Sequence, residues 1–121
     1  MKIYTGTRNR IGTRVQVTEE TGFSFSFRQT DDLKLRTDLR DHSPTGFEWG
    51  YPGSGPSQLA LAILADVVGD ELAQVHYQSF KRDVIQNFYG NHWQINSDMV
   101  KEYVVNRYVE QAEQMKIGGA N

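Results

Sequence analysis

The sequence predicts an α+β fold in which a small antiparallel sheet of about four or five strands packs against about three helices. Short segments that alternate apolar and polar residues occupy the chain up to Arg28, and such alternation indicates strands with one solvated face. Helical periodicity dominates after Pro56. The most apolar segment, Leu59–Ala65, predicts a helix that neighbours cover on nearly every side.

Length and composition indicate one domain over residues 1–121, with a core over 2–115 and a frayed end over 116–121. The chain has no cysteine, which excludes disulfides and thiolate metal sites and fits a reducing compartment. Its longest apolar stretch is far too short to span a bilayer, and its formal net charge of −2 argues against a general nucleic-acid coat. We therefore expect a soluble, cytoplasmic protein.

Three strands are predicted before residue 29. The first is Lys2–Thr5, and Gly6–Gly12 has the composition of a long hairpin loop that carries two exposed arginines. The second strand is Arg14–Thr18, and Glu19–Gly22 closes it. The third, Phe23–Arg28, alternates strictly, so its three phenylalanines point to one side.

A long connection is expected between these strands and the buried helix. Residues 29–45 mix charges and leucines at no sustained period, which indicates a loop with at most a short helical turn. His42–Gly46 is a turn by composition, because proline and glycine flank hydroxyl residues that bond their own backbone. The turn leads into a short predicted strand, Phe47–Trp49, and then into a glycine-rich loop.

The buried helix is expected to begin at the end of this loop and to reach Val68. Proline suits a first helical turn because its φ is already fixed and it has no N–H, so Pro56 marks the start, with Ser54 or Gly55 as the cap. Gly69 follows, and glycine can adopt the left-handed conformation that ends a helix.

Two further helices and one strand complete the chain. Asp70 can cap a second helix through about residue 88, and His92–Ile95 has the composition of a strand. Asn96 or Ser97 then caps a third helix, which extends to about residue 115. The predicted buried residues of these helices are Ala73, Tyr77, Phe80, Val84 and Phe88, followed by Val100, Tyr103 or Val104, Tyr108 and Ala112.

The loop Gly50–Ser57 has the glycine spacing of a phosphate-cradling P-loop. Pro56 stands where that motif needs its lysine, so nucleotide hydrolysis by this motif is excluded. The dinucleotide pattern fails because Gln58 replaces its third glycine, and the esterase elbow fails because Pro52 replaces its first glycine. Two alternatives stay open: a tight strand-to-helix turn without a ligand, or an anion site at the helix N-terminus.

A polar and aromatic cluster around this helix N-terminus supplies the candidate ligand-binding residues. They are Arg40, His42, Ser43, Glu48, Trp49, Gly53, Ser54 and Gly55. Glu48 lies beside an aromatic residue, where desolvation favours acid–base chemistry; alternatively, it only bonds the backbone of the following turn. We assign no catalytic residue and expect no cofactor. The three histidines are too scattered in the sequence to predict a metal site.

The N-terminal strands carry a second candidate site, a basic patch of Arg8, Arg10 and Arg14. Arginines near an aromatic residue such as Tyr4 have the ingredients of a phosphate-contacting surface. Charged residues at sheet edges also serve simply to prevent edge-to-edge pairing, so an ordinary solvated edge is the alternative.

Five segments form a specific sequence pattern that centres on HSPTGFEWGYxGSGPxxLALAIL. They are Asp38–Tyr51, Gly53–Pro56, Leu59–Leu64, Phe80–Ile85 and Trp93. Together they resemble an uncharacterised family of small bacterial, phage and plasmid proteins, a domain of unknown function, over residues 2 to about 100. Pro52 stands where that family has glycine, which stiffens the loop, and the final helix lies outside the shared part. Occurrence on mobile elements implies accessory roles such as countering host defence.

We expect a non-enzymatic binding protein that takes a phosphate-bearing small ligand, such as a nucleotide signal, at the strand–loop–helix site. The alternative is a protein–protein inhibitor or assembly factor that acts on a host protein through the third helix and the basic hairpin. A third hypothesis is an enzyme with Glu48 or His42 as its base. No membrane partner is expected, whereas nucleic acid and a homo-oligomer stay open.

Overall fold

The structure, a computed structural model, describes residues 1–21 and 27–119 and has the predicted α+β architecture. Four strands form one antiparallel sheet in the order β3-β2-β1-β4. They are β1 (Lys2–Arg8), β2 (Thr13–Thr21), β3 (Phe27–Asp32) and β4 (His92–Asn96). The helices are α1 (Ser54–Val68), α2 (Asp70–Asp83) and α3 (Ser97–Gly119), and a short 3₁₀ helix, Ile85–Asn87, follows α2.

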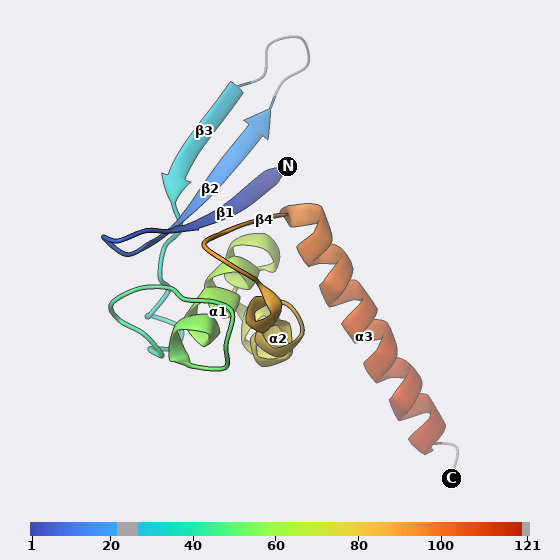
Figure 1. The fold of residues 1–121 in the computed structure, drawn as a ribbon. Coiled ribbons are helices and arrows are strands. Elements are labelled where there is room, and N and C mark those ends of the chain that lie inside the picture. The colour runs from blue at the N-terminus through green and yellow to red at the C-terminus, as the bar shows by residue number, and fades with distance from the viewer. Residues whose placement is uncertain (22–26, 120–121) are drawn as a thin grey trace.

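Helix α1 lies at the centre of the core, as its apolar sequence predicted. Figure 1 shows α1 and α2 packed together beneath one end of the sheet, with the long loop before α1 wrapped around the start of the helix. Every residue of α1 from Gly55 to Ala65 is buried, and the sheet contributes Tyr4, Val15 and Ile95 to the same core. A helix that is apolar on all sides is stable only when several neighbours cover it, which this arrangement provides.

The strands are longer than predicted. β1 continues through Gly6 to Arg8, so the hairpin turn is only residues 9–12. β3 includes residues 29–32, which were expected to be a loop; they pair with β2 at the edge of the sheet, where both faces tolerate polar side chains. Most of the predicted strand Phe23–Arg28 falls on residues 22–26, which lie outside the described part of the chain.

The prediction of a strand at Phe47–Trp49 is wrong. Both end residues of this segment are buried, but none of the described strands pairs with it. Side chains of the sheet hold it instead, since the Thr13 hydroxyl donates to the Phe47 carbonyl at 2.8 Å and the Arg8 guanidinium donates to the Trp49 carbonyl at 3.3 Å. Buried residues flank the half-buried Glu48 there, an alternation like that of a strand, which explains the error.

Glycines cap α1 and α2, each just before the predicted cap positions. Gly53 is the N-cap of α1 in place of Ser54 or Gly55, and it supplies no side-chain hydrogen bond. Gly69 precedes α2 in place of the predicted cap, Asp70. Its φ of +90° permits the tight turn between the two helices, a conformation that a side chain would disfavour.

Helix α3 extends further than predicted and leaves the body of the protein. Asn96 caps it as expected, because its Oδ1 accepts the Met99 N–H at 2.9 Å. Val100 and Val104 are buried, whereas Tyr108 is 67% exposed, so the predicted buried stripe holds only for the first half of the helix. Figure 1 shows the second half projecting away from α1 and α2.

Helix α2 is shorter than predicted. It ends at Asp83 instead of near residue 88, and a 3₁₀ turn carries the chain on toward β4. The predicted buried stripe lies on the core, with Ala73, Tyr77 and Phe80 buried and Val84 and Phe88 partly buried against them.

Candidate functional site

A cleft of about 420 Å³ opens beside the N-terminus of α1, and we call it the tyrosine cleft. Its lining residues are Arg8, Glu48, Trp49, Gly50, Tyr51, Phe88, Tyr89 and Gly90. The cleft thus joins the end of β1 to the loop before α1 and the loop before β4. Three of its members, Arg8, Glu48 and Trp49, were candidates from the sequence, whereas Tyr51 and Tyr89 were not.

Two exposed aromatic side chains form the rim of the tyrosine cleft. Tyr89 is 94% exposed and Tyr51 is 47% exposed. An exposed tyrosine offers a flat apolar ring and a polar hydroxyl together, which is why tyrosine is enriched at binding surfaces. The sequence signal for Tyr89 was the turn Tyr89–Asn91, but a turn alone does not indicate which loop it will meet.

The floor of the cleft is a rigid aromatic group. Trp49 is 1% exposed, and its indole N–H donates to the Gly90 carbonyl at 2.9 Å. The Trp93 ring meets Trp49 edge to face at 5.7 Å, and Phe88 stacks on Trp93 at 4.6 Å. Gly6 lies beneath Trp93 in β1, and any side chain there would overlap the indole. Trp49 therefore supports the cleft from below and presents little surface of its own.

Arg8, the last residue of β1, lies across this floor and contacts both loops. Its Nη2 forms an ion pair with Glu48 at 2.6 Å, and its guanidinium lies 4.4 Å from the centre of the Trp49 ring. Its Nη1 makes only long contacts, to the Gly90 carbonyl at 3.4 Å and the Asn91 Oδ1 at 3.5 Å. A ligand therefore replaces the long contacts of Nη1 more easily than the short ion pair of Nη2.

The N-terminus of α1 adjoins the same cleft through Tyr51. The ring of Tyr51 lies against Gly53, so that a side chain added there would come within 2.8 Å of it. On the other side, Glu48 packs so closely on Gly55 that an added Cβ would lie 2.6 Å from the Glu48 Cβ. No side chain of the described residues caps this end of α1, and Ser54 is exposed there.

The remaining predicted ligand-binding residues lie on the long loop before α1. Two of them contact Gln58, which is one turn further along α1 than Ser54. Gln58 is fully buried, and its Oε1 accepts the backbone N–H groups of His42 at 2.8 Å and Ser43 at 3.0 Å. The His42 ring is 2.9 Å from the Tyr77 hydroxyl of α2. Arg40 is exposed on the same loop. The structure therefore separates this group from the tyrosine cleft, with the first turn of α1 between them.

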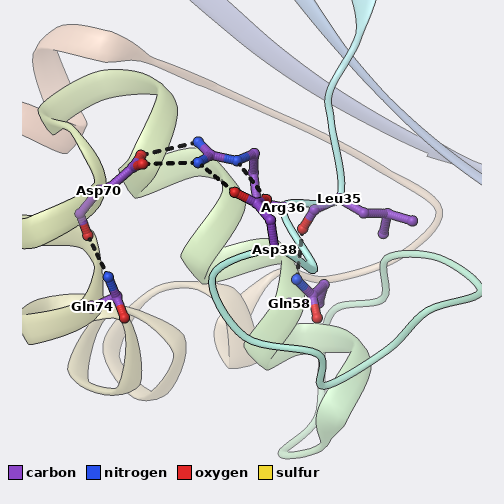
Figure 2. Close-up of polar contacts among 6 residues, drawn as sticks. All are labelled: Leu35, Arg36, Asp38, Gln58, Asp70 and Gln74. Atoms are coloured by element: carbon purple, nitrogen blue, oxygen red, sulfur yellow. Dashed lines mark hydrogen bonds and ion pairs between the residues drawn. The ribbon is translucent and has the colours of Figure 1, made fainter.

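An ion-pair network that the sequence did not indicate holds this long loop in place (Figure 2). Arg36 binds both carboxylate oxygens of Asp70, at 3.1 and 2.9 Å, and also binds Asp38. Its φ of +59° is unusual for a residue with a side chain. The hydrogen bond from Arg36 holds the pKa of Asp38 below its ordinary value, and the two carboxylates raise the pKa of Arg36. Figure 2 also shows the Gln58 amide donating to the Leu35 carbonyl, at 2.6 Å.

The three arginines of the predicted basic patch lie apart. Arg8 points to the helix side of the sheet, whereas Arg14 occupies the opposite face, since it follows the residue that pairs with Arg8. Arg14 forms an ion pair with Asp32 at 2.9 Å. Arg10 is exposed in the hairpin turn, and Tyr4 is fully buried beneath the sheet.

Within residues 1–21 and 27–119, no group of three or more potential ligand side chains gathers closely enough to hold a metal ion. None of the helices described there combines the length and the hydrophobicity of a membrane span.

A family model described as "Family of unknown function (DUF6166)" matches residues 4–106. The matched range includes the whole tyrosine cleft and ends within α3, before its projecting half. No curated protein and no solved structure matches the chain.

Proposed function

We propose that this chain, which belongs to a family of unknown function (DUF6166), is a non-enzymatic binding protein for a nucleotide. The base would enter the tyrosine cleft, and the phosphate would bind at the N-terminus of α1. One observation carries the proposal: a helix end without a side-chain cap adjoins a cleft with two exposed tyrosines on its rim.

The cleft has properties that suit a nucleobase. Its volume of about 420 Å³ lies within the range of small-molecule sites, roughly 300–1,000 Å³. Exposed Tyr51 and Tyr89 offer flat rings for stacking, a contact worth about 1–3 kcal/mol per base. The Arg8 guanidinium, fixed by Glu48, leaves its Nη1 able to donate to a base or a phosphate oxygen.

The phosphate end of the proposed site favours a ligand of low charge. The N–H groups of Ser54 and Gly55 begin α1 and have no partner within the helix; because Gly55 is buried and Ser54 is exposed, the Ser54 N–H is the donor that a phosphate reaches at the positive end of the dipole. Glu48 neutralises Arg8 and packs against Gly55, which places a negative charge beside the same helix end. A cyclic nucleotide, with one negative charge per phosphodiester, therefore fits better than a triphosphate.

The enzyme hypothesis has weaker support from the same geometry. Glu48 is engaged by Arg8 at 2.6 Å, and the His42 ring nitrogen is engaged by the Tyr77 hydroxyl at 2.9 Å. Neither group is therefore poised to abstract a proton in the tyrosine cleft.

We further propose that the protein acts in the cytoplasm as an accessory factor of a phage or plasmid, for example against host defence.

Calorimetry against mono-, di- and cyclic nucleotides tests this function. The Tyr89→Ala variant should bind about tenfold more weakly than wild type, because it removes a stacking ring. Tyr108→Ala is the matched control, since Tyr108 is also exposed but lies on the projecting half of α3. Absence of heat with every nucleotide, or an equal loss in both variants, would remove the proposal.

A protein-binding role is the second candidate, and the projecting half of α3 favours it. This half exposes Tyr108, Val109 and Met115, and Val105 is exposed just before it. Such side chains commonly anchor helix-mediated contacts with a partner. A host protein retained at equal stoichiometry by Tyr89→Ala but lost with Val105→Glu would support an inhibitor or assembly factor.

A further inference from the structure

The tyrosine cleft contains a fixed donor–acceptor pair, the guanidinium of Arg8 and the carboxylate of Glu48. Both residues line the cleft, and Arg8 Nη2 lies 2.6 Å from Glu48 Oε1. The two side chains are 31% and 35% exposed, so a ligand in the cleft can reach them. The pair therefore presents hydrogen-bond donors and acceptors side by side to a base that enters the cleft.

Glu48 keeps most of its capacity to accept hydrogen bonds. Its Oε1 accepts from Arg8, whereas Oε2 has no hydrogen-bond partner among the residues that the structure describes. An ionised carboxylate offers about four lone-pair sites, of which Arg8 takes one. Close packing against Gly55 holds Glu48 in place. The cleft therefore has a positioned acceptor for two neighbouring donors of a ligand.

Arg8 places a donor beside this acceptor. Its Nη2 is occupied by Glu48 and by the Trp49 carbonyl at 3.3 Å. Its Nη1 makes only the long contacts to the Gly90 carbonyl and the Asn91 side chain, at 3.4 and 3.5 Å. A carbonyl oxygen of a base can therefore accept from Nη1 without breaking the short ion pair.

We infer that the tyrosine cleft selects guanine among the bases, with Glu48 as the specificity-determining residue. The Watson–Crick edge of guanine has two adjacent donors, N1–H and the exocyclic N2 amine, and the O6 acceptor lies next to them. In the proposed complex, the two donors bind the Glu48 carboxylate and O6 accepts from Arg8. This inference rests on the proposed nucleotide site and adds the identity of its base.

The other bases match this pair less well. Adenine and cytosine each have a single amine beside a ring nitrogen that accepts, so only one group donates to Glu48. Uracil and thymine place one N–H between two carbonyl oxygens, and one of these oxygens then faces the carboxylate. A base in the cleft also displaces water from the carboxylate. An oxygen that loses its water without gaining a donor disfavours the wrong base.

Calorimetry with cyclic GMP, cyclic IMP and cyclic AMP tests the inference on the unmodified protein. Cyclic IMP differs from cyclic GMP only in lacking the N2 amine, so it should bind about tenfold more weakly. Cyclic AMP also has an amine in place of O6 and should bind at least as weakly as cyclic IMP. Equal affinities for cyclic GMP and cyclic IMP would overturn the inference.

Glu48→Gln tests the residue itself. This change keeps the size of the side chain and replaces one acceptor oxygen with an amide that donates. It should lower the ratio of cyclic GMP affinity to cyclic AMP affinity about tenfold, because an amide can also pair with adenine. Glu20→Gln is the matched control, since Glu20 also forms an ion pair with an arginine, Arg28 at 2.8 Å, but lies on the opposite face of the sheet.

The possible results are distinct. A preference for cyclic GMP that falls in Glu48→Gln and persists in Glu20→Gln supports the inference. Equal binding of cyclic GMP and cyclic AMP, with both weakened by Tyr89→Ala, would overturn the guanine preference and leave the nucleotide site standing. An unchanged ratio in a Glu48→Gln variant with a wild-type circular dichroism spectrum would also overturn it. If that variant does not fold, the comparison of cyclic GMP with cyclic IMP on the unmodified protein decides. Absence of binding by every nucleotide would remove both this inference and the proposed function.

Discussion

Gln58 connects the long loop before α1 to the helix that the loop precedes. Its amide makes three hydrogen bonds to backbone groups: it accepts from His42 and Ser43 and donates to Leu35. All three partners lie more than a dozen positions away in the sequence, and the side chain is fully buried. A buried amide bound in this way positions the loop, because moving the loop breaks these hydrogen bonds and leaves the buried amide without its partners.

Replacing Gln58 with methionine tests this role. Gln58→Met keeps the approximate volume but leaves two N–H groups and one carbonyl without partners, so the free energy of unfolding should fall by about 2–4 kcal/mol. Ser54→Ala, one turn earlier on the same helix face and exposed, should change it by less than about 0.5 kcal/mol. Urea denaturation measures both. Equal stability of the Gln58→Met variant and wild type would show that the loop is held elsewhere.

The candidate residues near α1 were partly predictable at this scale. Arg8, Glu48 and Trp49 were chosen separately, from a basic hairpin and from a helix start, and the structure brings them together. In the sequence, Gln58 stood out only because it replaces the third glycine of the dinucleotide pattern. Its role, and that of Arg36, depends on partners far away in the chain, and no local pattern encodes such pairs.

Tyr103 links α3 to α2, while α3 also contacts α1, β1 and β4. Tyr103 donates its hydroxyl to Asp83 of α2 at 2.8 Å, and its ring meets Phe80 at 5.2 Å. His76 of α2 is 3% exposed. Burial, with a smaller contribution from the charge of Arg107 on α3, lowers the pKa of His76 below its ordinary value of 6.5.

This pKa shift predicts a loss of stability in acid. Below pH 6.5 the unfolded chain binds a proton at His76 more readily than the folded chain does. The free energy of unfolding therefore decreases as the pH is lowered, until the pH passes the pKa of His76 in the folded protein. Urea denaturation at pH 7.5 and pH 5.5 should therefore show a smaller difference in His76→Gln than in wild type. His92→Gln, at an exposed histidine, should behave like wild type. Identical pH dependence in all three proteins would contradict this account.

The projecting half of α3 should contribute little to the stability of the body. Tyr108 and Val109 are exposed there, and the family match ends at residue 106. A chain that ends at Glu110 should unfold within about 0.5 kcal/mol of the full chain. Val100→Ala, in the buried first half, should cost about 2 kcal/mol. A large loss in the shortened chain would mean that the second half packs on the body in solution.

Helices and strands could be predicted where burial imposes a regular spacing of apolar residues on the sequence. They could not be predicted where burial imposes no such spacing. The alternation in β2 and the apolar run of α1 reflect what each element covers, so both were correctly predicted. Residues 29–32 of β3 are polar and lie at the sheet edge, so they have no such period. Phe47–Trp49 has a strand-like period without a strand partner, because the sheet holds it through side chains.

The molecule as a whole is arranged around the two ends of α1. Its N-terminus adjoins the tyrosine cleft, and its C-terminal half lines a separate, larger hollow of about 1090 Å³ between the helix and the sheet. The buried helix therefore sets the positions of both hollows relative to the core.

The most direct test of the central proposal is an amide chemical-shift titration of ¹⁵N-labelled protein with cyclic AMP and cyclic GMP. Binding at the proposed site would shift the backbone N–H signals of Ser54, Gly55 and Gly90 and the indole N–H of Trp49, because these groups surround the N-terminus of α1 and the tyrosine cleft. Signals from the projecting half of α3 would stay unchanged. No shift at saturating ligand, or shifts confined to residues away from this cleft, would contradict the account.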